Sequence, residues 1–347
     1  MTKLPLNPKV CVIGAGAIGG LIAAHLVRNG TTVHVIDRGE QLTAIRKQGL
    51  QVFSRDKDHN IHVRIQAGEE FDIGPQDIII LAVKTIQIVD AVRNIDALMH
   101  DDTIVITVQN GVPWWYFQRH GGKHESRSLE TIDPDGAISR YIEPSRIIGC
   151  VAYPAATIER PGVIRHIEGN RFPVGELDNT TSDRVNWISD MLTCAGLKSP
   201  ILADLRSEIW LKLWGTLAFN PISMLTGATL EGICRNAYTR ELAAEMMREA
   251  ENIATDLGIS FRVPMEKRIV GAERVGAHKT STLQDIEAGR ETELDALLGA
   301  VIELGRLTGI PTPHLDSVYA SCKLLENTVL QEITNPDITD NLIPPCQ

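Results

Sequence analysis

Features that would place the chain in a membrane or in an oxidising compartment are missing. No apolar run reaches the length of a membrane-spanning helix, and no apolar segment of the signal-peptide kind precedes the first predicted strand. The six cysteines are scattered without Cys-x-x-Cys spacing, so neither a disulfide scaffold nor a zinc module is indicated. We therefore expect a cytoplasmic protein with reduced, mostly buried thiols, no metal site and no membrane partner.

Positive charge is also scarce. Lysine and arginine total 34 against 44 aspartates and glutamates, which gives a formal net charge of -10. Nucleic-acid binding needs clustered basic side chains, so this balance argues against a nucleic-acid partner. The rest of the composition, 43% hydrophobic and 22% charged, is ordinary for a globular enzyme, and 347 residues are enough for about two domains.

The chain is organised around a glycine-rich turn near its N-terminus. An apolar run at 10–13 predicts a buried strand, Gly14-x-Gly16-x-x-Gly19 follows it, and a helical pattern continues to residue 30. In a dinucleotide-binding turn the first glycine permits the bend, the second lets the backbone approach a pyrophosphate, and the third allows close packing. The helix N-terminus attracts the same anion. A glycine turn without a ligand is the alternative. The predicted cofactor-binding residues here are Gly14, Ala15, Gly16, Ala17, Ile18 and Gly19.

A second strand is predicted at 32–36, and it ends at Asp37 and Arg38. A carboxylate at this place accepts hydrogen bonds from the adenosine ribose of NADH. An arginine one residue later suits the 2′-phosphate of NADPH, because a guanidinium forms charge-assisted hydrogen bonds to phosphate. The two residues therefore indicate different cofactors, and the sequence leaves the choice open.

Two continuous apolar segments, 77–83 and 103–108, predict buried parallel strands. They end at Lys84 and Asn110, and ligands of parallel sheets bind beyond the carboxyl ends of the strands. Both residues are thus predicted to lie at the cofactor. A surface lysine and a turn-forming asparagine are the alternatives.

The rest of the first half completes a Rossmann-type domain, predicted at 1–203. A hairpin is expected at 51–65, and 119–145 has the irregular composition of an inserted, solvent-exposed loop. Within that loop, His120 and His124 have the four-residue spacing of a metal pair, but two intervening glycines and the lack of a third ligand argue against a metal. The remaining predicted elements are strands at 147–151 and 163–167 and a helix at about 182–194.

The second half, 204–347, has long helical periods and predicts an all-helical domain. On its first helix Lys212, Thr216 and Asn220 recur every four residues and so share one face. The flanking sequence is too apolar for a well-solvated helix, so this face is predicted to line a cleft. Desolvation would lower the pKa of such a lysine and suit it to proton transfer.

A later helix is predicted from Ser281 to about residue 308. Ser281 with Gln284, or the next pair one residue along, fits a capping box, and capping is the alternative to a binding role for the serine. Glu293 lies beside the buried side of this helix and is expected to be half-buried.

These pieces together resemble the ketopantoate reductase family, the 2-dehydropantoate 2-reductases, over nearly the whole chain. The resemblance implies reduction of 2-dehydropantoate, a branched 2-oxo acid, to pantoate with NADPH, as in pantothenate biosynthesis. It also implies a Rossmann domain joined to a helical substrate domain, with the site in the cleft between them, and a homodimer. The matching segments are Gly14–Gly19, Arg38, 83–85, 109–111, 210–212, 220–221, 281–285 and 292–295.

The resemblance also implies a role for each matching residue. Lys212 would be the general acid that protonates the forming alkoxide, and Glu293 would bind the substrate hydroxyl or hold that lysine. Ser281 would bind the substrate carboxylate. The other implied contacts are Asn110 and Asn220 to the substrate and the nicotinamide, Lys84 to the cofactor or the incoming oxo acid, and Arg38 to the 2′-phosphate. Thr216, on the same helix face as Lys212 and Asn220, is predicted to contact the substrate as well.

The chain departs from the family pattern at Thr216 and His278, where asparagine is usual, at Asp37, and in the length of the 119–145 loop. These differences leave two alternatives open, a reductase of another 2-oxo acid or a lactone, and a non-catalytic redox sensor. Geometry adds a further question, because Ser281 and Glu293 would lie about 18 Å apart on a straight helix. Either the serine lies in a loop, or the helix bends near Gly289, or one role is wrong.

Overall fold

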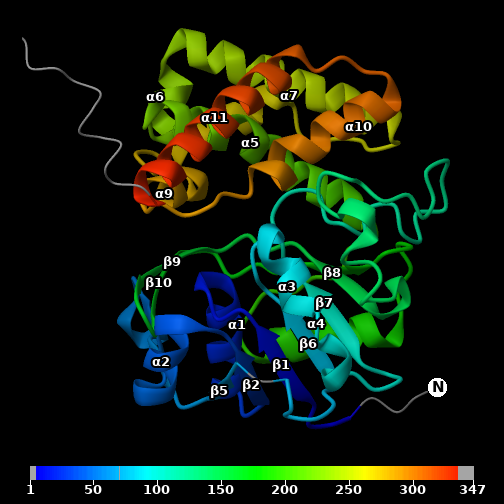
Figure 1. Cartoon of the computed structure of the whole chain (residues 1–347), viewed down its shortest axis with the longest axis vertical. Helices are drawn as coiled ribbons and strands as arrows, with labels where there is room; N and C mark the ends of the chain where they lie inside the picture. The colour runs from blue at the N-terminus through cyan, green and yellow to red at the C-terminus, as the bar shows by residue number, and fades with distance from the viewer. Residues whose placement is uncertain (1–4, 70, 335–347) are drawn as a thin grey trace, which may run out of the picture. The chain divides into compact units, whose positions relative to one another are not determined.

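The computed structural model describes residues 5–69 and 71–334, which form two compact units, Met1–Glu208 and Ile209–Gln347 (Figure 1). The predicted boundary after residue 203 precedes helix α5 (Leu205–Thr226), and the division lies inside that helix. Of the six cysteines, Cys346 lies outside the described residues. Four others are buried, Cys194 is exposed, and all five are free thiols.

The first unit is built on a seven-stranded sheet with the order β11-β8-β7-β6-β1-β2-β5. All neighbouring strands from β8 to β5 in this order are parallel. The edge strand β11 pairs antiparallel with β8. The order reverses between β1 and β6, which is the switch point where such sheets bind ligands. The predicted Rossmann-type α/β class is confirmed. The strands are β1 (Lys9–Ile13), β2 (Thr32–Ile36), β5 (Gln66–Gly68), β6 (Ile78–Leu81), β7 (Ile104–Thr107), β8 (Ile147–Cys150) and β11 (Val174–Glu176).

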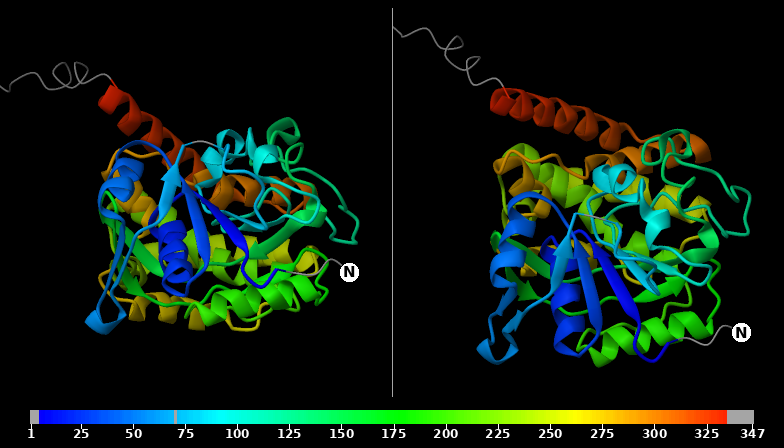
Figure 2. Two further views of the ribbon diagram at one scale, coloured as in Figure 1. Left: turned by 90° about the horizontal axis from the view of Figure 1, so that it is seen from below. Right: turned by 60° about the horizontal axis from the view of Figure 1, so that its bottom comes forward.

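A smaller sheet with the order β4-β3-β10-β9 accompanies the first. The hairpin predicted at 51–65 is present, but its first strand also pairs in parallel with β10, more than a hundred residues later. The strand predicted at 163–167 therefore belongs to this sheet. Helix α1, drawn in blue beside the blue strands in Figure 2, contacts strands of both sheets. Most of its side chains from Gly19 to Leu26 are therefore buried. The strands are β3 (Leu50–Ser54), β4 (Ile61–Val63), β9 (Ala155–Arg160) and β10 (Val163–Glu168).

The sequence analysis identified α1 and α4 among the helices of the first unit and missed α2 and the short α3. Helix α2 follows β2 directly and carries a narrow apolar stripe, Leu42 and Ile45, which explains why its periodicity is weak. The α-helices are α1 (Ala17–Arg28), α2 (Gly39–Gln48), α3 (Ile88–Val92) and α4 (Asp183–Cys194). Short 3₁₀ turns lie at Lys57–His59, Thr85–Gln87, Ile95–Leu98, Pro134–Gly136 and Pro144–Arg146.

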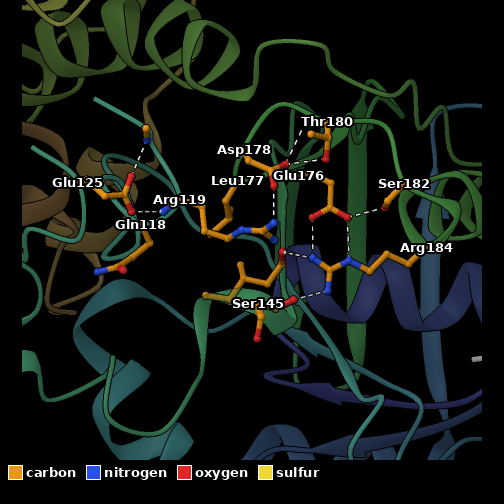
Figure 3. Close-up of polar contacts among 12 residues, drawn as sticks. Gln118, Arg119, Glu125, Ser145, Glu176, Leu177, Asp178, Thr180, Ser182 and Arg184 are labelled. Carbon is orange, nitrogen blue, oxygen red and sulfur yellow. Dashed lines mark hydrogen bonds and ion pairs between the residues drawn. The ribbon is translucent and has the colours of Figure 1, made fainter. Parts of the chain in front are cut away.

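The 119–145 segment was predicted to be an inserted, solvent-exposed loop. It contains only turns, bends and short 3₁₀ turns and many of its residues are exposed, but a few of its side chains are buried. Leu129, Asp133 and Ile138 are at most 1% exposed, because the segment packs its own apolar side chains against the unit. The buried Asp133 carboxylate accepts hydrogen bonds from the Ile138 N–H (2.6 Å) and the Ser139 hydroxyl (2.5 Å). At the start of the segment Arg119 pairs with Asp178, next to β11 (Figure 3).

The second unit is all-helical throughout its described part. Helix α7 packs against α8, α10 and α11, and the Trp214 indole of α5 donates a hydrogen bond to the Met247 carbonyl of α7 (2.7 Å). The α-helices after α5 are α6 (Leu230–Arg235), α7 (Ala237–Asp256), α8 (Met265–Arg274), α9 (Ser281–Glu287), α10 (Ala300–Thr308) and α11 (Pro313–Thr334). A π-helical turn, Asp295–Gly299, precedes α10.

The helix predicted from Ser281 to about 308 is therefore interrupted. Helix α9 ends at Glu287, and Gly289 has φ +63°, a left-handed conformation that favours glycine. The Arg290 N–H then bonds back to the Asp285 carbonyl (2.9 Å), which closes the turn. The apolar periodicity continued through this break because apolar residues are buried on both sides of it, Leu283 and Ile286 before and Leu297 and Leu298 after.

Candidate active site

The glycine turn has the geometry that its spacing predicts. Gly14 lies at φ +94°, and a Cβ on Gly19 would meet the Gly14 carbonyl oxygen at 2.0 Å and the Ala82 Cβ at 2.8 Å. Helix α1 can approach the sheet this closely only with glycine at position 19. Gly16 differs, because a Cβ there would have nothing within 4 Å. The open space beside Gly16 fits the close approach of a pyrophosphate to the backbone.

Asp37 and Arg38 follow β2, and their side chains have different surroundings. One Asp37 carboxylate oxygen accepts the Ala15 N–H at 2.6 Å, and the other accepts the Arg38 N–H at 2.7 Å. Burial raises the pKa of Asp37, and these two N–H groups oppose the shift in part. Arg38 is exposed at the N-terminus of α2. The aspartate thus holds the glycine turn, while the guanidinium stays available to an anion.

Lys84 and Asn110 follow neighbouring strands at one edge of the sheet. The register pairs Ile13 with Leu81 and Leu81 with Thr107, so the segments after β1, β6 and β7 leave the sheet side by side. Lys84 and Asn110 are both half-buried. The structure therefore brings the two predicted residues to the same edge as the glycine turn.

Gln109 is a residue at this edge that sequence reasoning did not select. Its amide Nε2 donates to the Leu81 carbonyl at 2.7 Å and so joins the ends of β7 and β6. Its Oε1 is buried and has no hydrogen-bond partner among the described residues. A buried unpaired acceptor is unusual. Its position directly after a predicted strand and before Asn110 was the available signal.

On α5, Lys212 and Thr216 are half-buried and Asn220 is buried. The Thr216 hydroxyl is within hydrogen-bond distance of the Leu213 carbonyl (3.1 Å), so its proton has a partner on the helix itself. The Asn220 amide donates to the hydroxyls of Thr282 (3.2 Å) and Ser281 (3.5 Å). The structure therefore brings Asn220 and Ser281 together, 61 residues apart in the chain.

Ser281 does not cap α9. The capping residue is Thr280, whose hydroxyl oxygen accepts the Leu283 N–H at 3.2 Å, and Ser281 is the first residue of the helix. Capping, the alternative considered for Ser281, is therefore wrong. Because the neighbouring threonine caps the helix, the exposed Ser281 hydroxyl is not needed for that task.

Glu293 is half-buried and follows a segment that α11 holds in place. The Glu326 carboxylate accepts hydrogen bonds from the Thr292 N–H (2.8 Å) and hydroxyl (2.6 Å). Lys323 lies 3.2 Å from the same carboxylate. Burial raises the pKa of Glu326, but the Thr292 hydrogen bonds and the lysine outweigh it, so the pKa is lowered overall. Because the helix breaks at Gly289, the estimate of about 18 Å between Ser281 and Glu293, which assumed a straight helix, does not apply.

His120 and His124 pack around Phe117, with ring centroids 5.5 and 5.3 Å from it. No group of three or more His, Cys, Asp or Glu side chains within 5–69 and 71–334 could hold a metal ion. In the same ranges, no helix has both the length and the apolar character needed to cross a membrane.

Comparisons with known proteins agree with this geometry. The family model described as "Ketopantoate reductase PanE/ApbA" matches residues 10–179, and its "C terminal" counterpart matches residues 204–326. A 2-dehydropantoate 2-reductase from Mesorhizobium japonicum is 47% identical over 318 residues, which are 91% of this chain and 97% of the relative.

Solved structures with this fold include more than one kind of enzyme. A Ralstonia solanacearum protein provisionally named a ketopantoate reductase aligns with a TM-score of 0.88 and 33% identity, over 92% of this chain and 98% of that one. A D-mandelate dehydrogenase solved with NADH and anilino(oxo)acetate aligns with a TM-score of 0.79 over 92% and 99% of the two chains. At 21% identity the latter shows the shared fold alone.

Proposed function

The chain belongs to the ketopantoate reductase family and is an oxidoreductase, and from this premise we propose that it reduces 2-dehydropantoate to pantoate with NADPH. The observation that carries the proposal is the glycine turn at the switch point of the sheet, with open space beside Gly16. A redox sensor would share this turn. A helix face that carries an amine, a hydroxyl and an amide favours the enzyme.

The glycine turn would hold the pyrophosphate of a nicotinamide dinucleotide, which supplies the hydride when bound. Gly14 and Gly19 support this assignment because a Cβ at either position would clash with the packed turn, and Gly16 supports it because the space beside it is open. Lys84 and Asn110, which leave the same sheet edge, would contact the nicotinamide half or the substrate. We assign them in this way because the glycine turn follows β1, whereas Lys84 and Asn110 follow the neighbouring strands β6 and β7.

Lys212 would donate the proton in the reaction. Hydride addition to a carbonyl carbon leaves a developing oxyanion, and an ammonium both stabilises this charge and can protonate it. Glu293 would orient the lysine or the substrate hydroxyl. Asn220 and Ser281, which lie together, would bind the substrate carboxylate through an amide N–H and a hydroxyl. The Thr216 hydroxyl, engaged with its own helix, would act on the substrate as an acceptor.

NADPH is proposed over NADH because of Arg38 and Asp37. Arg38 is exposed at a helix N-terminus, a place that favours a phosphate. Asp37 accepts two backbone N–H groups and so need not oppose the 2′-phosphate. NADH use remains the alternative, and the cofactor preference is tested below.

The test is oxidation of NADPH, followed by its absorbance, with a panel of 2-oxo acids that includes 2-dehydropantoate, an aromatic 2-oxo acid and a lactone. We expect 2-dehydropantoate to give the highest kcat/KM. The aromatic acid is included because a mandelate dehydrogenase shares the fold. Preference for another member would support the other-substrate alternative, and no turnover on any member would favour the sensor.

Lys212→Ala should lower kcat by about 10²–10³ with little change in cofactor affinity, because one group that stabilises developing charge contributes about that much. Lys267→Ala, which removes an exposed lysine of α8, is the matched control and should behave as wild type. A normal kcat in Lys212→Ala would remove this lysine from the mechanism.

The assembly and the location are proposed more coarsely. A homodimer agrees with the family resemblance. A cytoplasmic location agrees with the free thiols of the described cysteines. Sedimentation equilibrium of the purified protein tests the dimer, and a mass of one chain would contradict it.

A further inference from the structure

We propose that Gln41 is a positioning residue for the dinucleotide-binding turn, and that it joins this turn to the β9–β10 hairpin. Gln41 lies in the first turns of α2, and its amide bonds in two directions. Its Nε2 donates to the Ala15 carbonyl at 2.6 Å, and its Oε1 accepts the Gly162 N–H at 2.9 Å. The inference rests on the proposed dinucleotide binding.

Both polar groups of Ala15 are held by side chains that follow β2. Asp37 accepts the Ala15 N–H at 2.6 Å, and Gln41 donates to the Ala15 carbonyl. Ala15 itself is fully buried, so these groups do not have water as a substitute partner. Two successive peptide planes of the turn are therefore fixed, one by an anionic acceptor and one by a neutral donor.

The orientation of these planes decides how the turn meets an anion. In a trans peptide the carbonyl and the next N–H point in opposite directions. Because Gln41 holds the Ala15 carbonyl, it also fixes the direction of the Gly16 N–H. Gly16 is the position with open space beside it. A turn free to rotate could present a carbonyl oxygen to the pyrophosphate, which would repel it.

The second bond of Gln41 explains why this side chain keeps one orientation. The hairpin turn packs tightly on α2, since a Cβ on Gly162 would lie 3.2 Å from the Ala44 Cβ and 3.1 Å from the Gln48 Nε2. Gly162 therefore presents its N–H to Gln41 from a fixed position. The smaller sheet thus supports the turn through one amide side chain.

This arrangement predicts a specific change in affinity. Gln41→Met keeps the shape of the side chain and loses both hydrogen bonds. We expect the Kd values for NADPH and NADH to rise by the same factor, about tenfold. The factor is shared because both cofactors contain the pyrophosphate. The kcat and the KM for the 2-oxo acid should stay within twofold of wild type.

The experiment is a titration of NADPH and NADH fluorescence on the full-length protein, with unfolding temperatures of the cofactor-free variants. Gln48→Met is the matched control, because Gln48 is on the same helix and bonds the same hairpin at the Pro161 carbonyl (3.2 Å). It should keep wild-type affinity. Gln41→Asn, one methylene too short to reach Ala15, is the second variant if the methionine variant does not fold.

If the Gln41 variants bound both cofactors with wild-type affinity, the inference about Gln41 would be overturned and the proposed function would stand. A loss for NADPH only would also overturn it, since that would make Gln41 a contact of the 2′-phosphate. If the wild-type protein itself bound neither cofactor, the proposed function would fail, and the inference with it.

Discussion

At the end of β2, Asp37 uses both carboxylate oxygens to accept backbone N–H groups, one from the glycine turn and one from its own neighbour. The sequence analysis considered this carboxylate as a hydrogen-bond acceptor for the ribose of NADH and left the choice of cofactor open. Its side chain also holds the glycine turn through the Ala15 N–H. The residue beside it, Arg38, is exposed, and we propose that its charge distinguishes NADPH from NADH.

These roles predict opposite patterns in two variants. Arg38→Ala should raise the KM for NADPH about tenfold or more and leave that for NADH nearly unchanged, because it removes a charge-assisted partner of the 2′-phosphate. Asp37→Ala should lower kcat/KM for both cofactors, because the Ala15 N–H loses its acceptor. Measurement of kcat/KM for both cofactors in the three proteins decides this. If Asp37→Ala instead abolishes a wild-type preference for NADH, the carboxylate binds ribose.

Glu326 gives a prediction about stability and pH. Its folded-state pKa is lowered, so the carboxylate stabilises the protein above its unfolded pKa, and this stabilisation is lost as the pH falls through the folded value. Glu326→Gln should therefore reduce the free energy of unfolding by about 1–3 kcal/mol at neutral pH. The difference from wild type should shrink toward pH 3.

Urea unfolding at several pH values measures this difference. Glu287→Gln is the control, because Glu287 forms an exposed pair with Lys279, and exposed pairs contribute little. A Glu326→Gln difference that does not change with pH would show that its charge is unimportant.

At the scale of elements, two glycines at the junction of β1 and α1 have different tasks: Gly19 is needed for packing, and Gly16 is proposed to be needed for cofactor binding. Gly19→Ala places a Cβ 2.0 Å from a backbone oxygen, so α1 must move away from the sheet. Gly16→Ala meets no protein atom within 4 Å. We expect Gly19→Ala to lower the unfolding temperature markedly or to prevent folding. Gly16→Ala should unfold like wild type and lose most of its cofactor affinity.

Thermal unfolding with and without NADPH checks both expectations. The wild-type protein and Gly19→Ala should differ without cofactor, whereas Gly16→Ala should differ only in the stabilisation that NADPH adds. Normal stabilisation of Gly16→Ala by NADPH would mean that no ligand approaches this position.

At the scale of the whole molecule, Arg206 at the start of α5 holds distant parts of the first unit together. Its buried guanidinium donates to three backbone carbonyls, those of Tyr116 (2.8 Å), Leu177 (2.5 Å) and Gln118 (2.9 Å). Burial lowers the pKa of Arg206. The residues just before the 119–145 segment and just after β11 are thereby fixed to one helix.

Arg206→Met should lower the unfolding temperature by several degrees, because three buried carbonyls lose a charged donor at about 1–3 kcal/mol in total. Arg127→Met, an exposed arginine within 119–145, is the control and should have little effect. Differential scanning calorimetry compares the two. Equal unfolding temperatures would show that the carbonyls find other donors.

The sequence by itself determined the Rossmann-type class, the strands that end at the predicted site and the helical nature of the second half. It could do so because the spacing of apolar residues and glycines is a local property, set by the geometry of one strand or one helix turn. The likeness of Gly14, Gly16 and Gly19 to a dinucleotide-binding turn is such a local property. So does the shared face of Lys212, Thr216 and Asn220.

Only the tertiary structure decided which hydrogen-bond partners each polar group has. The Asp37 carboxylate turns to Ala15, Gln41 reaches both Ala15 and Gly162, and Thr280 rather than Ser281 caps α9. These partners lie up to 121 residues apart, and several donors of equal chemistry compete for each acceptor. The competition is settled by burial and by the positions of the packed backbone, which residue spacing alone does not contain.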